Sequence, residues 1–204
     1  MPDKLKYNRE QTLSKRLNSF LVKQFNLPEK DYYSELDTEG FIGLKSVLSD
    51  INNILTLRVT SGFIEWVSMS LELDLSAKEE LKRIVFESKP NSNGYDAWLG
   101  YPVSFVAEVK CNIPINHGSI YGSAQRKGIE KDVIGLINGK RKASMLPHSC
   151  LKFFVFLDTP EIRRANEQLL TVSEIFKMNM LFDYENTKLS RTDIIYGVYV
   201  SPNA

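Results

Sequence analysis

The sequence has few of the residues that define disulfide-bonded or membrane-spanning proteins. Its 204 residues include only two cysteines and two histidines. Secreted domains held by disulfides need more cysteine, so a reducing cytoplasm is the expected environment. No apolar run approaches the length of a membrane span, and the segment from Met1 to Lys4 has no apolar core of a signal peptide. These absences predict a cytoplasmic protein.

The chain also lacks an excess of charge of either sign. Lysine and arginine number 26 against 25 acidic residues, a net charge of +1. No global basic field therefore indicates a nucleic-acid partner, and any such partner must be held by a local patch. The length suits one domain with a helical extension. We expect an N-terminal helical extension packed on the core over 1–58, and the core itself over 59–204.

Helical periodicity dominates the N-terminal part. Apolar residues recur at helical spacing over 9–26, and Pro28 ends that helix. A second helix is predicted over 40–55. Its apolar residues are Phe41, Leu44, Val47, Leu48, Ile51, Ile54 and Leu55.

The next stretch is predicted to change from helix to strand. Thr60 to Gly62 interrupts the helical pattern, and apolar and polar residues then alternate over 67–75. A period of two is typical of a half-buried strand. Ser76 and Glu79 match a capping box, which predicts a helix to about Phe86.

The C-terminal half predicts alternating helices and strands. A helix is expected from 119–123 to a glycine cap at Gly139, and the apolar run 151–158 predicts a strand buried on both faces. Pro160 starts a further helical stretch that continues to about Met180, with an interruption expected near Thr171, and 193–200 forms a last strand. The fold class predicted is mixed α/β, a central sheet flanked by helices.

A hairpin lies at the centre of this pattern. Gly100 to Pro102 separates two strand-like runs, so a three-residue loop would pair Leu99 with Val103. Alternation places the odd-numbered residues on one face, and all of them are apolar: Ala97, Leu99, Val103, Phe105, Ala107, Val109 and Cys111.

The even face of the hairpin gathers charged residues. It includes Asp96, Glu108 and Lys110, with Asp96 opposite Val106. Two carboxylates suit Mg²⁺, which keeps several waters for a phosphate and a nucleophile. A nearby lysine can orient or deprotonate a metal-bound water and offset charge on a phosphorane. The alternative is a surface hairpin with a Glu–Lys pair and no site.

These residues resemble the motif of the PD-(D/E)XK nuclease superfamily. The motif here is Asp96, eleven intervening residues, then Glu108-Val109-Lys110. The resemblance implies a restriction-endonuclease-like core in which Asp96, Glu108 and the carbonyl of Val109 bind Mg²⁺, for which Mn²⁺ can substitute. It implies a catalytic role for Lys110 near the water, and for Gln125 on the next helix.

The resemblance covers about residues 93 to 158, and it departs from the motif at one position. Tyr95 stands where the family has proline. That proline carries no ligand, so the metal site does not depend on it.

A basic segment follows the hairpin and is expected to contact DNA phosphates, which give sequence-independent affinity. Its residues are Arg126, Lys127, Lys131, Lys140, Arg141 and Lys142. The alternative is a solvated loop. The expected function is a Mg²⁺-dependent DNA endonuclease, restriction-like and homodimeric. A junction-resolving or repair nuclease, or a non-catalytic binding or scaffold protein, remains open.

The cysteines and histidines form a rival constellation. Cys111, His117, His148 and Cys150 flank the proposed core, and two of each could hold zinc. Their spacings differ from those of zinc fingers, and Cys111 falls on the apolar face of the hairpin. A buried cysteine and loop histidines are the simpler interpretation.

Overall fold

The computed structural model describes residues 8–88, 94–118, 120–141, 143, 147–182 and 189–202. The chain divides into two compact units, Met1–Ile51 and Asn52–Ala204, where the sequence predicted a division at 58/59. Among the residues described, no helix combines the length and the apolar character that crossing a membrane would require.

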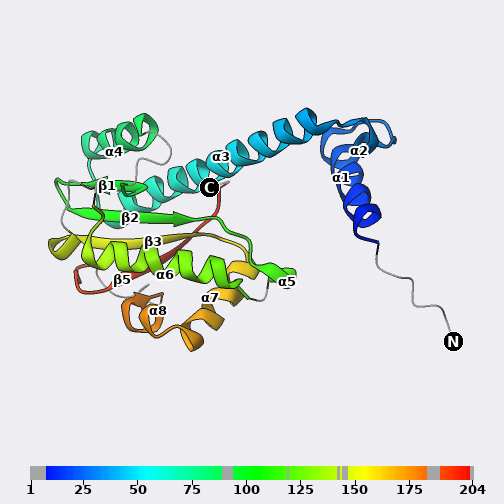
Figure 1. Cartoon of the computed structure of the whole chain (residues 1–204). Coiled ribbons are helices and arrows are strands. Elements are labelled where there is room, and N and C mark those ends of the chain that lie inside the picture. The colour runs from blue at the N-terminus through cyan, green and yellow to red at the C-terminus, as the bar shows by residue number, and fades with distance from the viewer. Residues whose placement is uncertain are drawn as a thin grey trace. The chain divides into compact units, whose positions relative to one another are not determined.

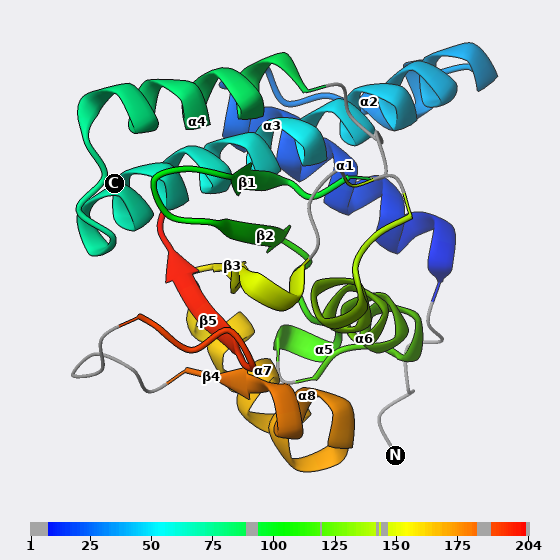
Figure 2. The ribbon, with the colours of Figure 1, turned by 90° about the vertical axis from the view of Figure 1, so that its left-hand side faces the viewer.

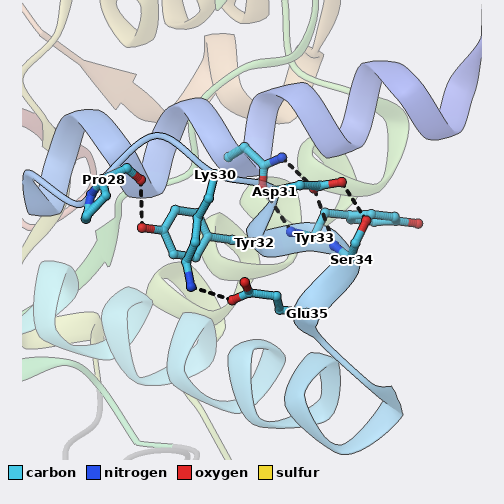
Figure 3. A network of polar contacts seen from close by, with 8 residues as sticks. Pro28, Lys30, Asp31, Tyr32, Tyr33, Ser34 and Glu35 are labelled. Atoms are coloured by element: carbon cyan, nitrogen blue, oxygen red, sulfur yellow. Dashed lines mark hydrogen bonds and ion pairs between the residues drawn. The ribbon is translucent and has the colours of Figure 1, made fainter.

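The N-terminal unit is helical, and polar contacts hold its turns. It contains α1 (Arg9–Phe25), α2 (Tyr32–Glu35) and the start of α3 (Thr38–Ser70). Asn18 on α1 donates to Asp31 (2.8 Å) and accepts from the backbone of Tyr33 (3.0 Å). Figure 3 shows Asp31 bonded to Ser34, and Lys30 paired with Glu35. The predicted helix over 9–26 is thus confirmed.

The predicted strand over 67–75 is wrong, because α3 continues through it to Ser70. Val59, Phe63 and Val67 are fully buried at helical spacing, whereas Met69 is 73% exposed. Gly62 does not break the helix. A Cβ at this position would lie 2.6 Å from a side-chain carbon of Val200, so the glycine lets α3 approach the sheet closely.

Helix α4 (Leu75–Glu87) confirms the predicted helix but begins at another cap. The side chain of Asp74 accepts a hydrogen bond from the backbone of Ala77 (2.8 Å), which makes Asp74 the N-cap. Ser76 is instead a residue of the first turn. An aspartate cap satisfies one of the unpaired N–H groups at the helix start.

Five strands form one mixed sheet in the order β1-β2-β3-β5-β4. They are β1 (Ala97–Leu99), β2 (Phe105–Lys110), β3 (Leu151–Leu157), β4 (Met180–Leu181) and β5 (Ile195–Val200). β1 is antiparallel to β2, and the other neighbouring pairs are parallel. The strands predicted over 151–158 and 193–200 are confirmed as β3 and β5. The two-residue β4 was not predicted, because helix was expected to about Met180.

Helices cover both faces of this sheet (Figures 1 and 2). On one face Phe63 of α3 packs against the rings of Phe105 and Phe153, with centroids 6.1 and 5.4 Å apart. On the other face Phe156 meets Phe176 of α8. The remaining helices are α5 (Ile115–Gly118), α6 (Ser123–Asn138), the 3₁₀ helix η1 (Pro147–Ser149), α7 (Pro160–Val172) and α8 (Glu174–Asn179). All seven residues of β3 are buried, as expected for a central strand.

The hairpin register differs from the prediction by two residues. Leu99 pairs with Phe105 rather than Val103, so five residues connect β1 to β2. A shift of two preserves the alternation of faces. The predicted faces therefore hold, while Asp96 moves from Val106 towards Glu108.

The reassigned cap of α4 gives a matched test. Asp74→Ala should lower the free energy of unfolding by about 1 kcal/mol, because it removes the cap. Ser76→Ala should leave it within about 0.5 kcal/mol. Urea denaturation of both variants would measure the difference, and a larger loss for Ser76→Ala would restore the capping box as the true start.

Candidate metal and phosphodiester site

Five charged side chains gather on the even face of β1 and β2, the face that α6 covers. Asp96 precedes β1, Glu108 and Lys110 lie on β2, Asp132 lies on α6, and Lys140 follows α6. The sequence predicted the first three on this face. The helix therefore adds a carboxylate and an ammonium group to the predicted trio.

Asp96 lies beside the end of β2 and is fixed by backbone bonds. Its N–H donates to the carbonyl of Ala107 (3.0 Å), and its Oδ2 accepts from the N–H of Val109 (2.7 Å). Asp96 keeps solvent access at the surface. The protein packed around its carboxyl group still raises the pKa of Asp96, and the Val109 bond and Lys140 partly oppose that rise. One carboxylate oxygen is thus held in place while the residue stays open to water.

Glu108 is the most deeply placed acid of the cluster, at 4% exposure. Loss of water is the main cause that raises its pKa to about 8, and the charge of Asp96 is the second. Lys140 opposes the rise from close range, with its Nζ 2.5 Å from Oε1. Oε1 nevertheless receives no hydrogen bond of good geometry from the residues the structure describes. A buried carboxylate oxygen without a well-formed partner is suited to a cation.

Lys110 has a different partner. Its Nζ lies 2.5 Å from Oδ2 of Asp132, and both side chains are largely buried. Asp132 also acts at longer range, because its charge raises the pKa of both Asp96 and Glu108. The cluster therefore contains three carboxylates that repel one another and two lysines that offset them.

Tyr95, which stands where the nuclease motif has proline, helps to hold α6 over the hairpin. Its hydroxyl donates to the carbonyl of Gly135 on α6 (3.3 Å). Its ring lies 5.6 Å from Nζ of Lys140. The departure from the motif is thus a packing residue beside the cluster.

Val109 and Gln125 are placed in other ways. Val109 points its side chain into the core at 5% exposure and uses its N–H on Asp96. Gln125 lies in the first turn of α6, where its amide accepts from the N–H of Gly122 and donates to the carbonyl of Ile113. It orders the segment that follows β2. The catalytic role of Gln125 and the metal contact of the Val109 carbonyl stay predictions.

The predicted basic segment is divided by the structure. Arg126, Lys127 and Arg141 are exposed, as phosphate contacts would require. Lys140 instead turns inward to Glu108. Lys142 lies outside the described residues.

Asp132 is the residue that sequence reasoning missed. It follows Ile129 by three residues and precedes Leu136 by four, and both of those side chains are buried. A charged residue at this spacing lies next to the apolar face of its helix. That position was the available signal, because charges beside a buried stripe are rare unless they are paired.

The zinc alternative gains nothing from the parts of the chain that are described. Cys150 is buried and His148 is exposed. The side chain of His117 lies outside the described residues. Where side chains are described, no three histidine, cysteine or acidic residues form a group that could hold a metal. Asp96 and Glu108 would supply two carboxylates, which suits an ion that keeps its waters, such as Mg²⁺.

No protein-family model, curated protein or solved structure matches this chain. Its function must therefore be argued from the geometry of the cluster.

The raised pKa of Glu108 makes stability depend on pH. The ordinary pKa of a glutamate is 4.5, and the pKa of Glu108 in the folded protein is about 8. Between these two pH values the folded protein keeps a proton on Glu108 that the unfolded protein releases. The stabilisation is complete below the ordinary pKa and is lost as pH rises through about 8. The free energy of unfolding should therefore fall between about pH 5 and pH 9 in urea titrations.

Glu108→Gln should flatten that dependence, because the amide cannot ionise. Glu87→Gln is the matched control, since Glu87 is an exposed residue of α4 paired with Arg83. Equal pH dependence in wild type and Glu108→Gln would contradict the burial of an ionisable Glu108.

Proposed function

We propose that this protein is a Mg²⁺-dependent DNA endonuclease that hydrolyses phosphodiester bonds. The observation that carries the proposal is the grouping of Asp96, Glu108 and Lys110 on one face of β1 and β2. Their order along the chain resembles the PD-(D/E)XK motif. The mixed sheet flanked by helices is compatible with the core of that superfamily.

Each member of the cluster has a separate role in this reaction. Asp96 and Glu108 would hold Mg²⁺ together with the carbonyl of Val109. The ion supplies Lewis-acid activation of the phosphate and of a water when it is bound. Lys110 orients that water and offsets the negative charge that develops on phosphorus. A bond forms between the water oxygen and phosphorus as the water loses a proton to solvent, and one bridging phosphorus–oxygen bond breaks as its leaving oxygen takes up a proton from solvent.

Asp132 is a positioning residue for this chemistry. Its contact of 2.5 Å holds the Lys110 ammonium group beside the carboxylates rather than free in solvent. An ammonium group held in advance costs no reorganisation when charge develops in the transition state.

DNA would be held by exposed cations near the cluster. Arg126 and Lys127 lie in the first turn of α6, and Arg141 follows its end. Phosphate contacts of this kind give affinity that depends strongly on salt and carries no sequence information. Within the superfamily we favour a restriction-like enzyme. A junction-resolving or repair nuclease would use the same chemistry.

A homodimer is the assembly we propose for this enzyme, because one cluster per chain cuts one strand and a duplex has two. The N-terminal unit offers a surface for pairing, since none of the described residues 8–51 is buried. Apolar residues of α3 recur there, and two pairs of them, Phe41 with Leu48 and Leu44 with Ile51, have the seven-residue spacing typical of paired helices. The most exposed are Ile42, Val47, Leu48 and Ile51.

A binding or scaffold protein is the second candidate, and the ion pairs support it. Lys110 pairs with Asp132, and Lys140 pairs with Glu108. A cluster in which each lysine has an acidic partner could serve only to hold α6 on the sheet. A measurement of DNA cleavage distinguishes the endonuclease from the scaffold protein.

Lys110→Ala tests the proposed reaction. Lys110 makes no metal bond, so the variant should keep its fold and most of its DNA affinity. It should lose cleavage by at least about 100-fold at saturating DNA, because Lys110 acts mainly in the transition state. Supercoiled plasmid with Mg²⁺ would report cleavage, and fluorescence anisotropy in Ca²⁺ would report binding.

Two further results decide between the candidates. Arg141→Ala is the matched control, because it should weaken binding and reduce its salt dependence while cleavage at saturating DNA persists. If wild type cuts neither DNA nor RNA with any divalent metal, the scaffold function replaces the nuclease. If Lys110→Ala cuts at the wild-type rate, the catalytic role proposed for Lys110 is wrong.

A further inference from the structure

The two lysines of the cluster are held in different ways, and that difference has a consequence for cation binding. Lys110 lies on a strand and pairs with Asp132, a carboxylate outside the proposed ligand pair. Lys140 follows α6 and forms an ion pair with Glu108, which is one of the two proposed metal ligands. A cation bound between Asp96 and Glu108 leaves the first contact intact but competes directly with the second.

Lys140 and a metal ion cannot share Oε1 of Glu108. Nζ of Lys140 is 2.5 Å from Oε1, and Mg²⁺ binds carboxylate oxygens at about 2.1 Å. Two cations on the same oxygen would repel each other strongly in a site with little water. An ion that binds Oε1 therefore has to displace the ammonium group.

The contacts of Lys140 permit that displacement. Nζ also donates to the carbonyl of Gly94 (2.9 Å) and lies over the ring of Tyr95. Water can replace both contacts, and Oε1 of Glu108 receives no well-aligned hydrogen bond from the described residues. Lysine carries its charge on a flexible stem, so the ammonium group can move without the backbone. Lys140 follows Gly139, the C-cap of α6, which has a positive φ of 92°.

We propose that Lys140 is a displaceable counter-ion that occupies the cation position of the Asp96–Glu108 pair until a divalent metal replaces it. When Glu108 is ionised, its buried charge would be uncompensated without a cation, which is costly. The ammonium group stabilises the metal-free protein and lowers its affinity for metal. This inference rests on the metal site of the proposed function and adds its regulation.

Calorimetry with Mn²⁺ alone at pH 8 tests the competition. Lys140→Met keeps the apolar stem and removes the charge, so it should bind Mn²⁺ about tenfold more tightly than wild type. Lys140→Arg keeps the charge and should not gain affinity. Arg141→Met removes a neighbouring exposed charge and should change the affinity far less than Lys140→Met does.

The displacement can also be observed in the wild-type protein. NMR of lysine ammonium groups should show the buried Nζ of Lys140 as a slowly exchanging signal without metal. Saturating Mg²⁺ should remove that signal and keep the signal of Lys110. Persistence of the Lys140 signal would overturn the proposal even if Lys140→Met failed to fold.

The calorimetric outcomes separate this inference from the proposed function. If wild type binds Mn²⁺ and Lys140→Met binds it equally or more weakly, the counter-ion role is wrong and the metal site stands. If neither protein binds Mn²⁺, the metal site and the counter-ion role are both wrong.

Discussion

The carboxylate of Glu108 is buried in the middle layer of the protein, and the surrounding structure has to compensate its charge. β2 is covered on both faces, so Val106 and Glu108 at its even positions are as buried as its odd positions, and Lys110 at its end is partly exposed. Val106 is apolar, so its burial needs no partner. Glu108 is ionisable, and its burial is accompanied by a pKa raised to about 8 and by the ammonium group of Lys140 at 2.5 Å. A buried acid with an electrostatic cost of this kind is typical of functional sites.

That constraint accounts for the arrangement of α6. The helix and the segment after it bring Asp132 and Lys140 to the hairpin, and the hydroxyl of Tyr95 donates a hydrogen bond to Gly135 of the same helix. Moving α6 away would leave Glu108 and Lys110 of the hairpin without their ion-pair partners. The helix that completes the core on this face therefore also assembles the charged cluster.

The sequence predicted the parts of the fold that depend on local pattern. Alternation in the hairpin identified the faces of Asp96, Glu108 and Lys110, because a shift of two residues in register leaves the faces unchanged. The apolar run of β3 likewise identified a central strand. The apparent strand over 67–75 failed for a tertiary reason, since Gly62 is required by the close approach of α3 to Val200.

The site was only partly predictable because its members are far apart in the chain. The motif located the hairpin residues, but nothing local shows that Lys140 turns inward while Arg141 faces solvent. The partner of Lys110 depends on the packing angle of α6. A charged residue between buried positions of that helix, Asp132, was the available signal.

Paramagnetic NMR would test most directly whether Asp96 and Glu108 hold a divalent cation. Mn²⁺ broadens the signals of nuclei close to it, so substoichiometric Mn²⁺ titrated into the ¹⁵N-labelled protein locates its binding site. This metal site predicts that the amide signals of Asp96, Glu108 and Val109 disappear first, and that Mg²⁺ restores them. Broadening centred elsewhere, or none at these three residues, would contradict it.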